Sequence, residues 1–140
     1  MKILIMLRNR VYADYIGYHI KKIANEVKIV NKSQEAIPLL LHQHWDIAII
    51  GISSGYYNGL EILDLYNKHY NEYSRMSKEE MPKRTKIYIL STVQDKKCMT
   101  NAMLLGAAGY FRVPQKTSEL LDHIIKNNLY QQTVTWNEII

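Results

Sequence analysis

One stretch of the sequence has the spacing of a catalytic serine. Residues 51–55 read Gly-Ile-Ser-Ser-Gly, which matches the G-x-S-x-G pattern of a nucleophile on a sharp turn between a strand and a helix. Asp95 or Asp122, followed by His123, come in the order that such a hydrolase needs. However, a second glycine-bounded loop at residues 55–59 precedes the next helix, and adjacent residues such as Asp122 and His123 face different sides of a helix. We therefore predict no catalytic residue and no enzymatic activity.

Histidine and cysteine side chains suggest metal binding or thiol chemistry. The five histidines are spread along the chain, and neither a cysteine pair nor a carboxylate completes a ligand set with them. Cys98 is the only cysteine, so no disulfide can form within the chain. Lys96 and Lys97 would lower the pKa of this thiol, but a half-buried, unreactive thiol is the better prediction. The sequence predicts no metal site.

The elements that must position these residues alternate in a regular way. Apolar runs predict five strands, at residues 2–6, 27–30, 46–50, 86–90 and 109–112. Apolar residues three or four apart predict helices at residues 12–23, 33–42, 60–73, 95–105 and 117–125. We expect Ser33 to cap the second helix, and Thr117 or Ser118 to cap the last one. This order predicts an α/β fold, a five-stranded parallel sheet with helices on both faces.

The composition is that of one folded domain. Of the 140 residues, 47% are hydrophobic and 22% are charged, as in ordinary globular proteins. We place the domain at residues 1–128 and a C-terminal tail at residues 129–140. No apolar run approaches the length of a membrane span, and Arg8 and Arg10 interrupt the start too early for a secretory signal. We therefore expect a cytoplasmic protein that does not contact the membrane.

Two regions of the chain resemble the receiver domain of two-component response regulators (the CheY-like family). Residues 46–61, DIAIIGISSGYYNGLE, are similar to the family's third strand, phosphoacceptor loop and start of the third helix. Residues 89–92, 105–110 and 113–114 resemble its switch Ser/Thr, its G-A-x-x-Y fifth strand and its K-P turn. The order of elements fits over residues 2–128, except for a longer link before the fourth strand. The resemblance implies the (βα)5 flavodoxin-like receiver fold.

The resemblance also shows which chemical groups the chain lacks. The family's phosphate-accepting aspartate falls on Gly51, which has no side chain to attack phosphorus. Its paired acidic residues fall on Leu7 and Arg8, which supply no oxygen ligand for Mg²⁺, and its lysine falls on Val113. Together with Ser91 at the switch position, these residues form a degenerate phosphorylation pocket. We expect it to bind no Mg²⁺ and no other cofactor, so the chain looks like a pseudo-receiver.

The implied function is protein–protein contact without phosphorylation. Ser91 and Tyr110 occupy the family's switch positions, and we favour a structural role for both over a partner-selected change of the Tyr110 rotamer. Because only a short tail follows the last helix, we expect a stand-alone domain. The resemblance implies an interface on the fourth helix, fifth strand and fifth helix, which binds a signalling protein or a kinase and is compatible with a homodimer. Its candidate members are Asp95, Lys97, Met99, Tyr110, Arg112 and Lys126.

A nucleic-acid-associated accessory domain is the alternative. The chain has 18 Lys and Arg against 13 Asp and Glu, a formal net charge of +5. This function would need Lys78, Lys83, Arg84 and Lys86 to form one basic patch. Because the other basic residues are scattered, nucleic acid is the less favoured partner.

Three tyrosines follow one another at helical spacing. We expect Tyr66 to touch the core. Tyr70 and Tyr73 extend beyond the core, where they anchor a loop or contact a partner.

Overall fold

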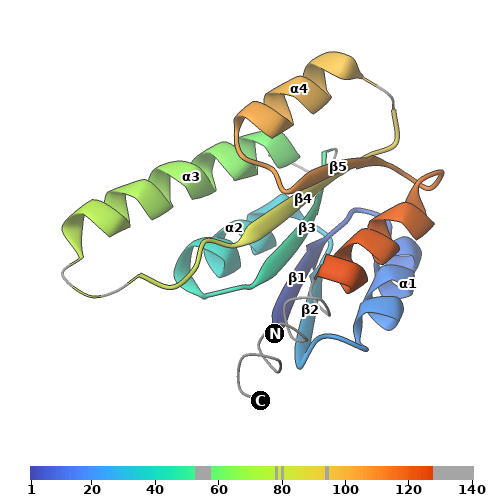
Figure 1. Cartoon of the computed structure of the whole chain (residues 1–140), viewed down its shortest axis with the longest axis horizontal. Coiled ribbons are helices and arrows are strands. Elements are labelled where there is room, and N and C mark those ends of the chain that lie inside the picture. The colour runs from blue at the N-terminus through green and yellow to red at the C-terminus, as the bar shows by residue number, and fades with distance from the viewer. Residues whose placement is uncertain (53–57, 78, 80, 94, 128–140) are drawn as a thin grey trace.

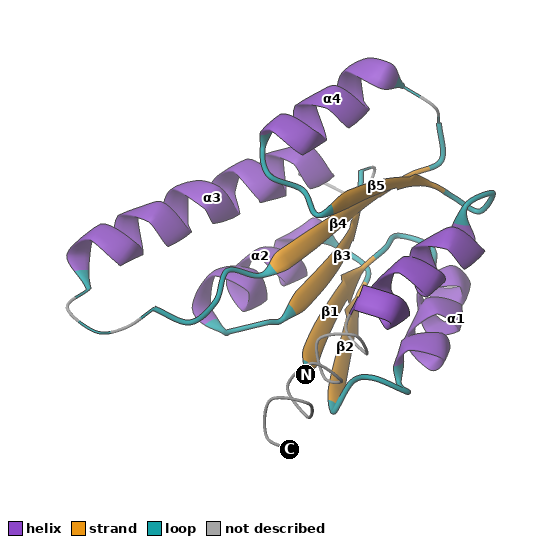
Figure 2. Ribbon diagram, viewed as in Figure 1, coloured by secondary structure: helices purple, strands orange, loops and turns teal. Residues whose placement is uncertain are grey.

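The computed structural model describes residues 1–52, 58–77, 79, 81–93 and 95–127. Strands and helices alternate along the chain (Figures 1 and 2). Residues 117–127 are helical as well and are called the C-terminal helix below. The other elements are β1 (Lys2–Met6), α1 (Arg10–Ile20), β2 (Glu26–Val30), α2 (Ser33–His42), β3 (Ile47–Gly51), α3 (Gly59–Met76), β4 (Lys86–Ser91), α4 (Lys96–Leu104) and β5 (Gly109–Arg112).

The five strands form one parallel sheet in the order β2-β1-β3-β4-β5. Helices α2, α3 and α4 lie on one face of this sheet, and α1 and the C-terminal helix lie on the other (Figure 1). The predicted fold class is therefore confirmed. Because all strands run the same way, their carboxyl ends meet at one edge of the sheet, where such folds place their sites.

Each face of the sheet has its own apolar core. Side chains alternate across a strand, so Ile3 and Ile5 of β1 pack toward α1 and the C-terminal helix, whereas Leu4 and Met6 pack toward α2, α3 and α4. These four side chains have no exposed surface. Burial on both faces explains why the inner strands are unbroken apolar runs.

The predicted helix caps are wrong at two positions. Lys32 occupies the N-cap of α2, and Ser33 is the first helical residue, completely buried. Thr117 already lies within the C-terminal helix, and Ser118 follows it there. The Thr117 hydroxyl donates to the carbonyl of Pro114 at 2.7 Å, a bond that a hydroxyl makes to the preceding turn. Ser33 and Thr117 are therefore the first residues of their helices rather than the caps that precede them.

Helix α3 is longer than the sheet that it covers. Its 18 residues span about 27 Å at 1.5 Å per residue, whereas the six residues of β4 span about 20 Å. The helix starts at the carboxyl edge and continues past the amino edge of the sheet (Figure 1). Tyr66, 5% exposed, packs in the core as predicted, and Tyr70 donates to the carbonyl of Pro82 in the link before β4.

Within the described part of the chain, no helix is both long enough and apolar enough to cross a membrane.

Candidate functional site

A hollow of about 530 Å³ opens where the carboxyl ends of the strands meet. Parallel pairing of β1, β3, β4 and β5 brings residues from four separate chain segments to this edge. All five residues predicted to form the degenerate pocket line it: Leu7, Arg8, Gly51, Ser91 and Val113.

Main-chain contacts hold the walls of this strand-end hollow. The amide of Ile52 donates to the carbonyl of Leu90 at 2.8 Å, and the amide of Val113 donates to the carbonyl of Ser91 at 2.8 Å. The first turn of α3 lies so close to the end of β3 that a Cβ added to Gly59 would be 3.0 Å from the carbonyl oxygen of Gly51. The hollow is therefore preformed by the ends of the strands themselves.

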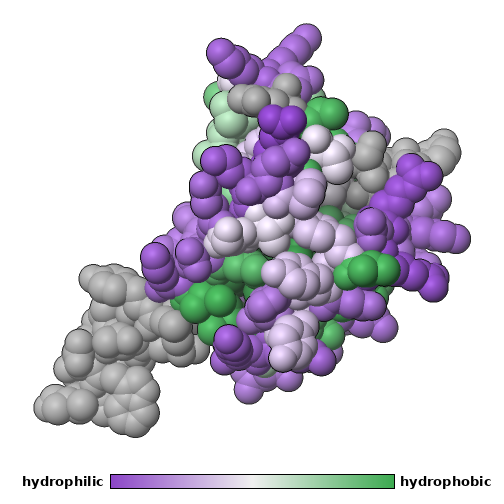
Figure 3. All heavy atoms as spheres, turned by 90° about the vertical axis from the view of Figure 1, so that its right-hand side faces the viewer, coloured by the Kyte–Doolittle hydropathy of each residue, from purple (hydrophilic) through white to green (hydrophobic). Residues whose placement is uncertain are grey.

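The strand-end hollow is apolar and carries one positive group. Leu7 and Val113 are 5% and 6% exposed, and among the described lining residues Arg8 is the only charged one. No carboxylate lines it there, and residues 53–57, which lie outside the described residues, are Ser-Ser-Gly-Tyr-Tyr in the sequence. Figure 3, from the side of α1 and the C-terminal helix, shows hydrophilic side chains around paler and apolar ones. The described walls hold neither a carboxylate nucleophile nor an acidic cation site.

The residues of the serine-hydrolase pattern are not assembled in the described part of the chain. Ser53 lies outside the described residues. The ring of His123 packs against Tyr88 and Phe111, with ring centres 5.5 and 5.8 Å away, and its Nε2 lies 3.0 Å from the Asn127 amide nitrogen. Asp122 is exposed on the same helix. His123 is thus part of an aromatic cluster beneath the sheet.

The two switch-position residues are engaged differently. The Ser91 side chain is buried, and its Oγ donates to the carbonyl of Val93 at 3.0 Å and accepts from the amide of Val93 at 3.2 Å. Tyr110 packs against the core on the α2–α3–α4 face, and its buried hydroxyl has no hydrogen-bond partner among the described residues. Ser91 thus closes a local turn, and Tyr110 points inward.

Four of the six predicted interface residues surround a second hollow. It measures about 350 Å³ and lies between the start of α4, β5 and the turn before the C-terminal helix. Lys97 and Lys126 are exposed but do not line it. The four lining residues are Asp95, Met99, Tyr110 and Arg112.

Sequence reasoning missed the most apolar part of this surface. A hollow of about 570 Å³ beside it is lined by Met99, Met103, Leu104, Tyr110 and Phe111, among others. Met103 is 51% exposed and Leu104 is 80% exposed. The spacing of Met99 and Met103, four residues apart on one helix face, was the available signal.

The start of α4 couples a carboxylate to the thiol. Asp95 caps the helix, and its Oδ1 accepts from the amides of Lys97 at 2.9 Å and Cys98 at 3.3 Å. These bonds lower the pKa of Asp95, and the bond from the Cys98 amide has the largest effect. The Cys98 thiol donates to Oδ2 at 3.4 Å, and this bond is the main reason why the pKa of Cys98 is raised. The Asp95 carboxylate raises the pKa of the thiol more than Lys97 lowers it, so the lysines do not activate Cys98 as the alternative required.

The described residues give little support to a metal site or to a nucleic-acid-binding surface. No group of three or more His, Cys, Asp or Glu side chains among them is placed to hold a metal ion. Of the predicted basic patch, Lys78 lies outside the described residues. The Arg84 guanidinium carbon lies 5.7 Å from the centre of the Tyr66 ring, so this cation is engaged in a cation–π contact.

Comparison with solved structures places the fold. The CheY-like response regulator receiver domain protein from Methanospirillum hungatei JF-1 has a TM-score of 0.74 and 17% identity, over 94% of this chain and 96% of that one. A two-component response regulator from Clostridium difficile has a TM-score of 0.74 and 15% identity, over 94% and 98%. A Burkholderia pseudomallei response regulator, solved with a phosphorylated aspartic acid, calcium and citrate, has a TM-score of 0.69 and 16% identity, over 98% and 74%. No model of a known family and no curated protein matches the sequence. The chain has the flavodoxin-like fold of response-regulator receiver domains.

Proposed function

We propose that this chain is a pseudo-receiver, which signals or scaffolds by binding another protein and accepts no phosphoryl group. The observation that carries this proposal is the composition of the strand-end hollow. Its described walls contain Arg8 as their only charged group and no carboxylate. The fold supports a place in two-component signalling, because receiver domains are generally signalling domains rather than enzymes.

Phosphoryl transfer needs groups that the described walls of this hollow do not supply. The attacking group must be a nucleophile, and Gly51 has no side chain. Mg²⁺ needs hard oxygen ligands, whereas Leu7 and Val113 present hydrocarbon and Arg8 would repel the ion. Several groups are missing together, so no single compensating residue restores the reaction.

A direct test uses a small phosphodonor. The protein is incubated with acetyl phosphate and Mg²⁺ and analysed by intact-mass spectrometry, with the Burkholderia response regulator as positive control, since its structure holds a phosphorylated aspartic acid. We expect the control to gain a phosphoryl group and this chain to gain none. Phosphorylation of this chain at a rate similar to the control would disprove the proposal.

The partner-binding surface is proposed to be the two hollows beside α4 and β5. Exposed Met99, Met103 and Leu104 lie next to the polar Asp95 and Arg112, an apolar centre with a charged border that is typical of protein interfaces. The same surface is available for a second copy of the chain.

Two matched variants test this surface. Met103→Glu places a charge in the apolar centre, and Tyr15→Glu places one on α1, across the sheet, at nearly equal exposure (51% and 50%). In affinity capture from nuclease-treated native lysate, we expect Met103→Glu to reduce recovery of the protein partner by about tenfold or more, the size of a hot-spot effect. Tyr15→Glu leaves recovery unchanged. Equal losses of recovery in both variants would contradict the proposal. So would a partner that the wild-type protein recovers only from lysate without nuclease treatment. Sedimentation of the same proteins tests for a homodimer.

A further inference from the structure

A separate hollow lies at the opposite, amino edge of the sheet. It measures about 350 Å³, within the size range of about 300–1,000 Å³ that small-molecule pockets occupy. Its walls are the end of α2, the part of α3 that extends past the sheet, and residues 81–85 of the link before β4. It exists because α3 and this link are longer than the sheet requires.

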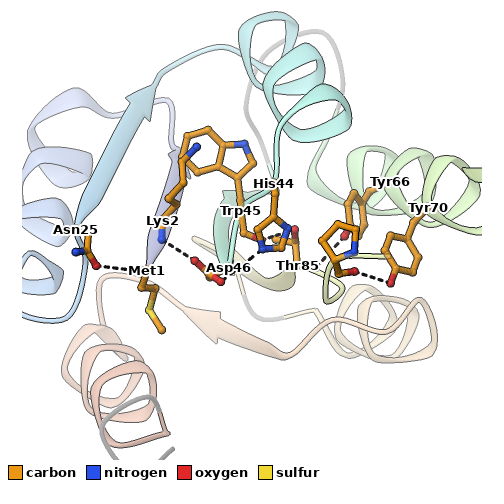
Figure 4. A network of polar contacts seen from close by, with 10 residues as sticks. Met1, Lys2, Asn25, His44, Trp45, Asp46, Tyr66, Tyr70 and Thr85 are labelled. Carbon is orange, nitrogen blue, oxygen red and sulfur yellow. Dashed lines mark hydrogen bonds and ion pairs between the residues drawn. The ribbon is translucent and has the colours of Figure 1, made fainter. Parts of the chain in front are cut away.

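Hydrogen bonds hold the walls of this amino-edge hollow in place (Figure 4). The Tyr70 hydroxyl donates to the carbonyl of Pro82 at 3.0 Å, and the amide of Thr85 donates to the Tyr66 hydroxyl at 2.8 Å. The Thr85 hydroxyl donates to the carbonyl of Trp45 at 2.6 Å, which ties the link to the start of β3. A ligand would therefore meet a preformed wall, and little ordering would oppose its binding.

Aromatic rings dominate the lining. Tyr66 and Tyr70 stand side by side with ring centres 5.9 Å apart, and Tyr73 continues the row along α3. His42 at the end of α2 meets His69 of α3 edge to face, with ring centres 6.0 Å apart. Such a lining favours a planar ring as occupant, because ring faces and edges attract one another at these distances.

The charge of the lining has one sign. Lys83 is the cationic side chain among the described lining residues, and no carboxylate is found among them. Beside the lining, the carboxylate of Asp46 lies 3.6 Å from the His44 imidazole and accepts a hydrogen bond from the amide of Lys2 at 2.7 Å (Figure 4). That carboxylate is occupied by its own neighbours, so an anion in the hollow meets Lys83 and imidazole N–H donors.

We propose that the amino-edge hollow binds a small anion that carries a planar aromatic ring. The ring packs among the tyrosines and histidines, and the anionic group is held by Lys83 with His42 or His69. This site lies at the other end of the sheet from the strand-end hollow and uses none of its residues. It goes beyond the proposed function and does not depend on it.

The test is a titration followed by protein-observed NMR on the full chain. Adenosine monophosphate and indole-3-acetate are the anionic probes, and adenosine and indole-3-acetamide are their neutral counterparts. We expect at least one anion to bind with a Kd of about 1 mM or lower, to shift the amide signals of His69, Tyr73 and Lys83, and to bind about tenfold more tightly than its neutral counterpart. The proposal is overturned if neither anion binds, if the neutral probes bind as well, or if the shifts map elsewhere.

Two substitutions assign the binding to this hollow. Lys83→Gln removes the cation, and Lys68→Gln removes a cation on the same side of the molecule that is paired with Asp64 and does not line the hollow. We expect Lys83→Gln to weaken binding of the anionic probe by about fivefold or more, and Lys68→Gln to leave its affinity unchanged. Tyr73→Ala, at a side chain 54% exposed, removes one ring without disturbing the core and weakens both the anion and its neutral counterpart. Equal effects of the two lysine variants would place the anion elsewhere.

Discussion

At the scale of single residues, Gly59 sets how closely α3 approaches the strand-end hollow. A Cβ at this position would lie 3.0 Å from the carbonyl oxygen of Gly51 and 3.3 Å from the Cα of Ile52, both main-chain atoms that cannot move aside freely. We expect Gly59→Ala to lower the free energy of unfolding by about 1–3 kcal/mol, as overpacking usually does. Urea denaturation measures the change.

Gly17 in α1 is the matched control. A Cβ there would meet the Cδ1 of Ile29 at 3.0 Å, the tip of a flexible side chain. Alanine is also favoured over glycine within a helix by about 1 kcal/mol. Gly17→Ala should therefore change the stability much less than Gly59→Ala. If the two substitutions have the same effect, main-chain proximity at Gly59 is not what limits this position.

The Asp95–Cys98 pair gives a second prediction at the residue scale. The thiol donates to the Asp95 carboxylate, and this bond is the largest cause of the raised pKa of Cys98. Asp95→Asn keeps a capping side chain but removes the negative charge. We therefore expect Cys98 of the variant to react faster with iodoacetamide at pH 8, because more of it is thiolate. An unchanged alkylation rate would show that the carboxylate does not control this thiol.

At the scale of elements, one hydrogen bond joins the two helices on the same face of the sheet. The hydroxyls of Tyr12 in α1 and Thr117 in the C-terminal helix are 2.6 Å apart. We expect Tyr12→Phe to lower the free energy of unfolding by about 1 kcal/mol at pH 7. In a Thr117→Val background the same substitution should cost less, and a double-mutant cycle by urea denaturation measures the coupling. A cycle without coupling would mean that the bond does not link the helices in solution.

The pH dependence of this link follows from the Tyr12 phenol. Burial raises the pKa of Tyr12 above its ordinary value of 10.0, and the bond to Thr117 lowers it by less. The folded state therefore holds the phenol proton more tightly than the unfolded state. The contribution of Tyr12 to the free energy of unfolding is complete below about pH 10 and is lost as the pH rises through the raised pKa of the folded state. The stability difference between wild type and Tyr12→Phe should shrink in urea titrations from pH 9 to pH 11. Burial raises the pKa of Tyr88 in the same direction, so alkaline loss of stability persists in the variant.

At the scale of the whole molecule, the two apolar cores share one sheet. Ile49 of β3 belongs to the core under α1, and Ile50 beside it belongs to the core under α2, α3 and α4. Neither core can be lost without disrupting the central strands, so we expect one cooperative transition. The buried Trp45 reports one core, and far-UV circular dichroism reports all helices. In a Trp136→Phe background, the two signals should show the same urea midpoint; separate midpoints would indicate that the faces unfold independently.

Most of the fold was predictable from the sequence because burial leaves a one-dimensional pattern. The apolar runs of β1, β3 and β4 showed strands covered on both faces, and the three-and-four spacing of the helices showed which sides they bury. The parallel topology accounts for the position of the strand-end hollow. Parallel strands end at one edge of the sheet, so the residues that follow them lie close together there. The resemblance to receiver domains had assigned Leu7, Gly51 and Val113 to one pocket, and all three line the strand-end hollow.

The tertiary structure alone decided which side chains meet across the chain. The bond between Tyr12 and Thr117, the inward position of the Tyr110 hydroxyl and the approach of His42 to His69 depend on rotamers and on how helices are placed against each other. A periodic pattern records how often a residue faces the core, but not which distant residue it faces. For this reason the sequence determined the sheet, its order of elements and the composition of the strand-end hollow. Helical spacing marked the faces that carry Met99 and Met103 and the three tyrosines, but only packing formed the hollow beside α4 and the amino-edge hollow, because their other walls come from other segments of the chain.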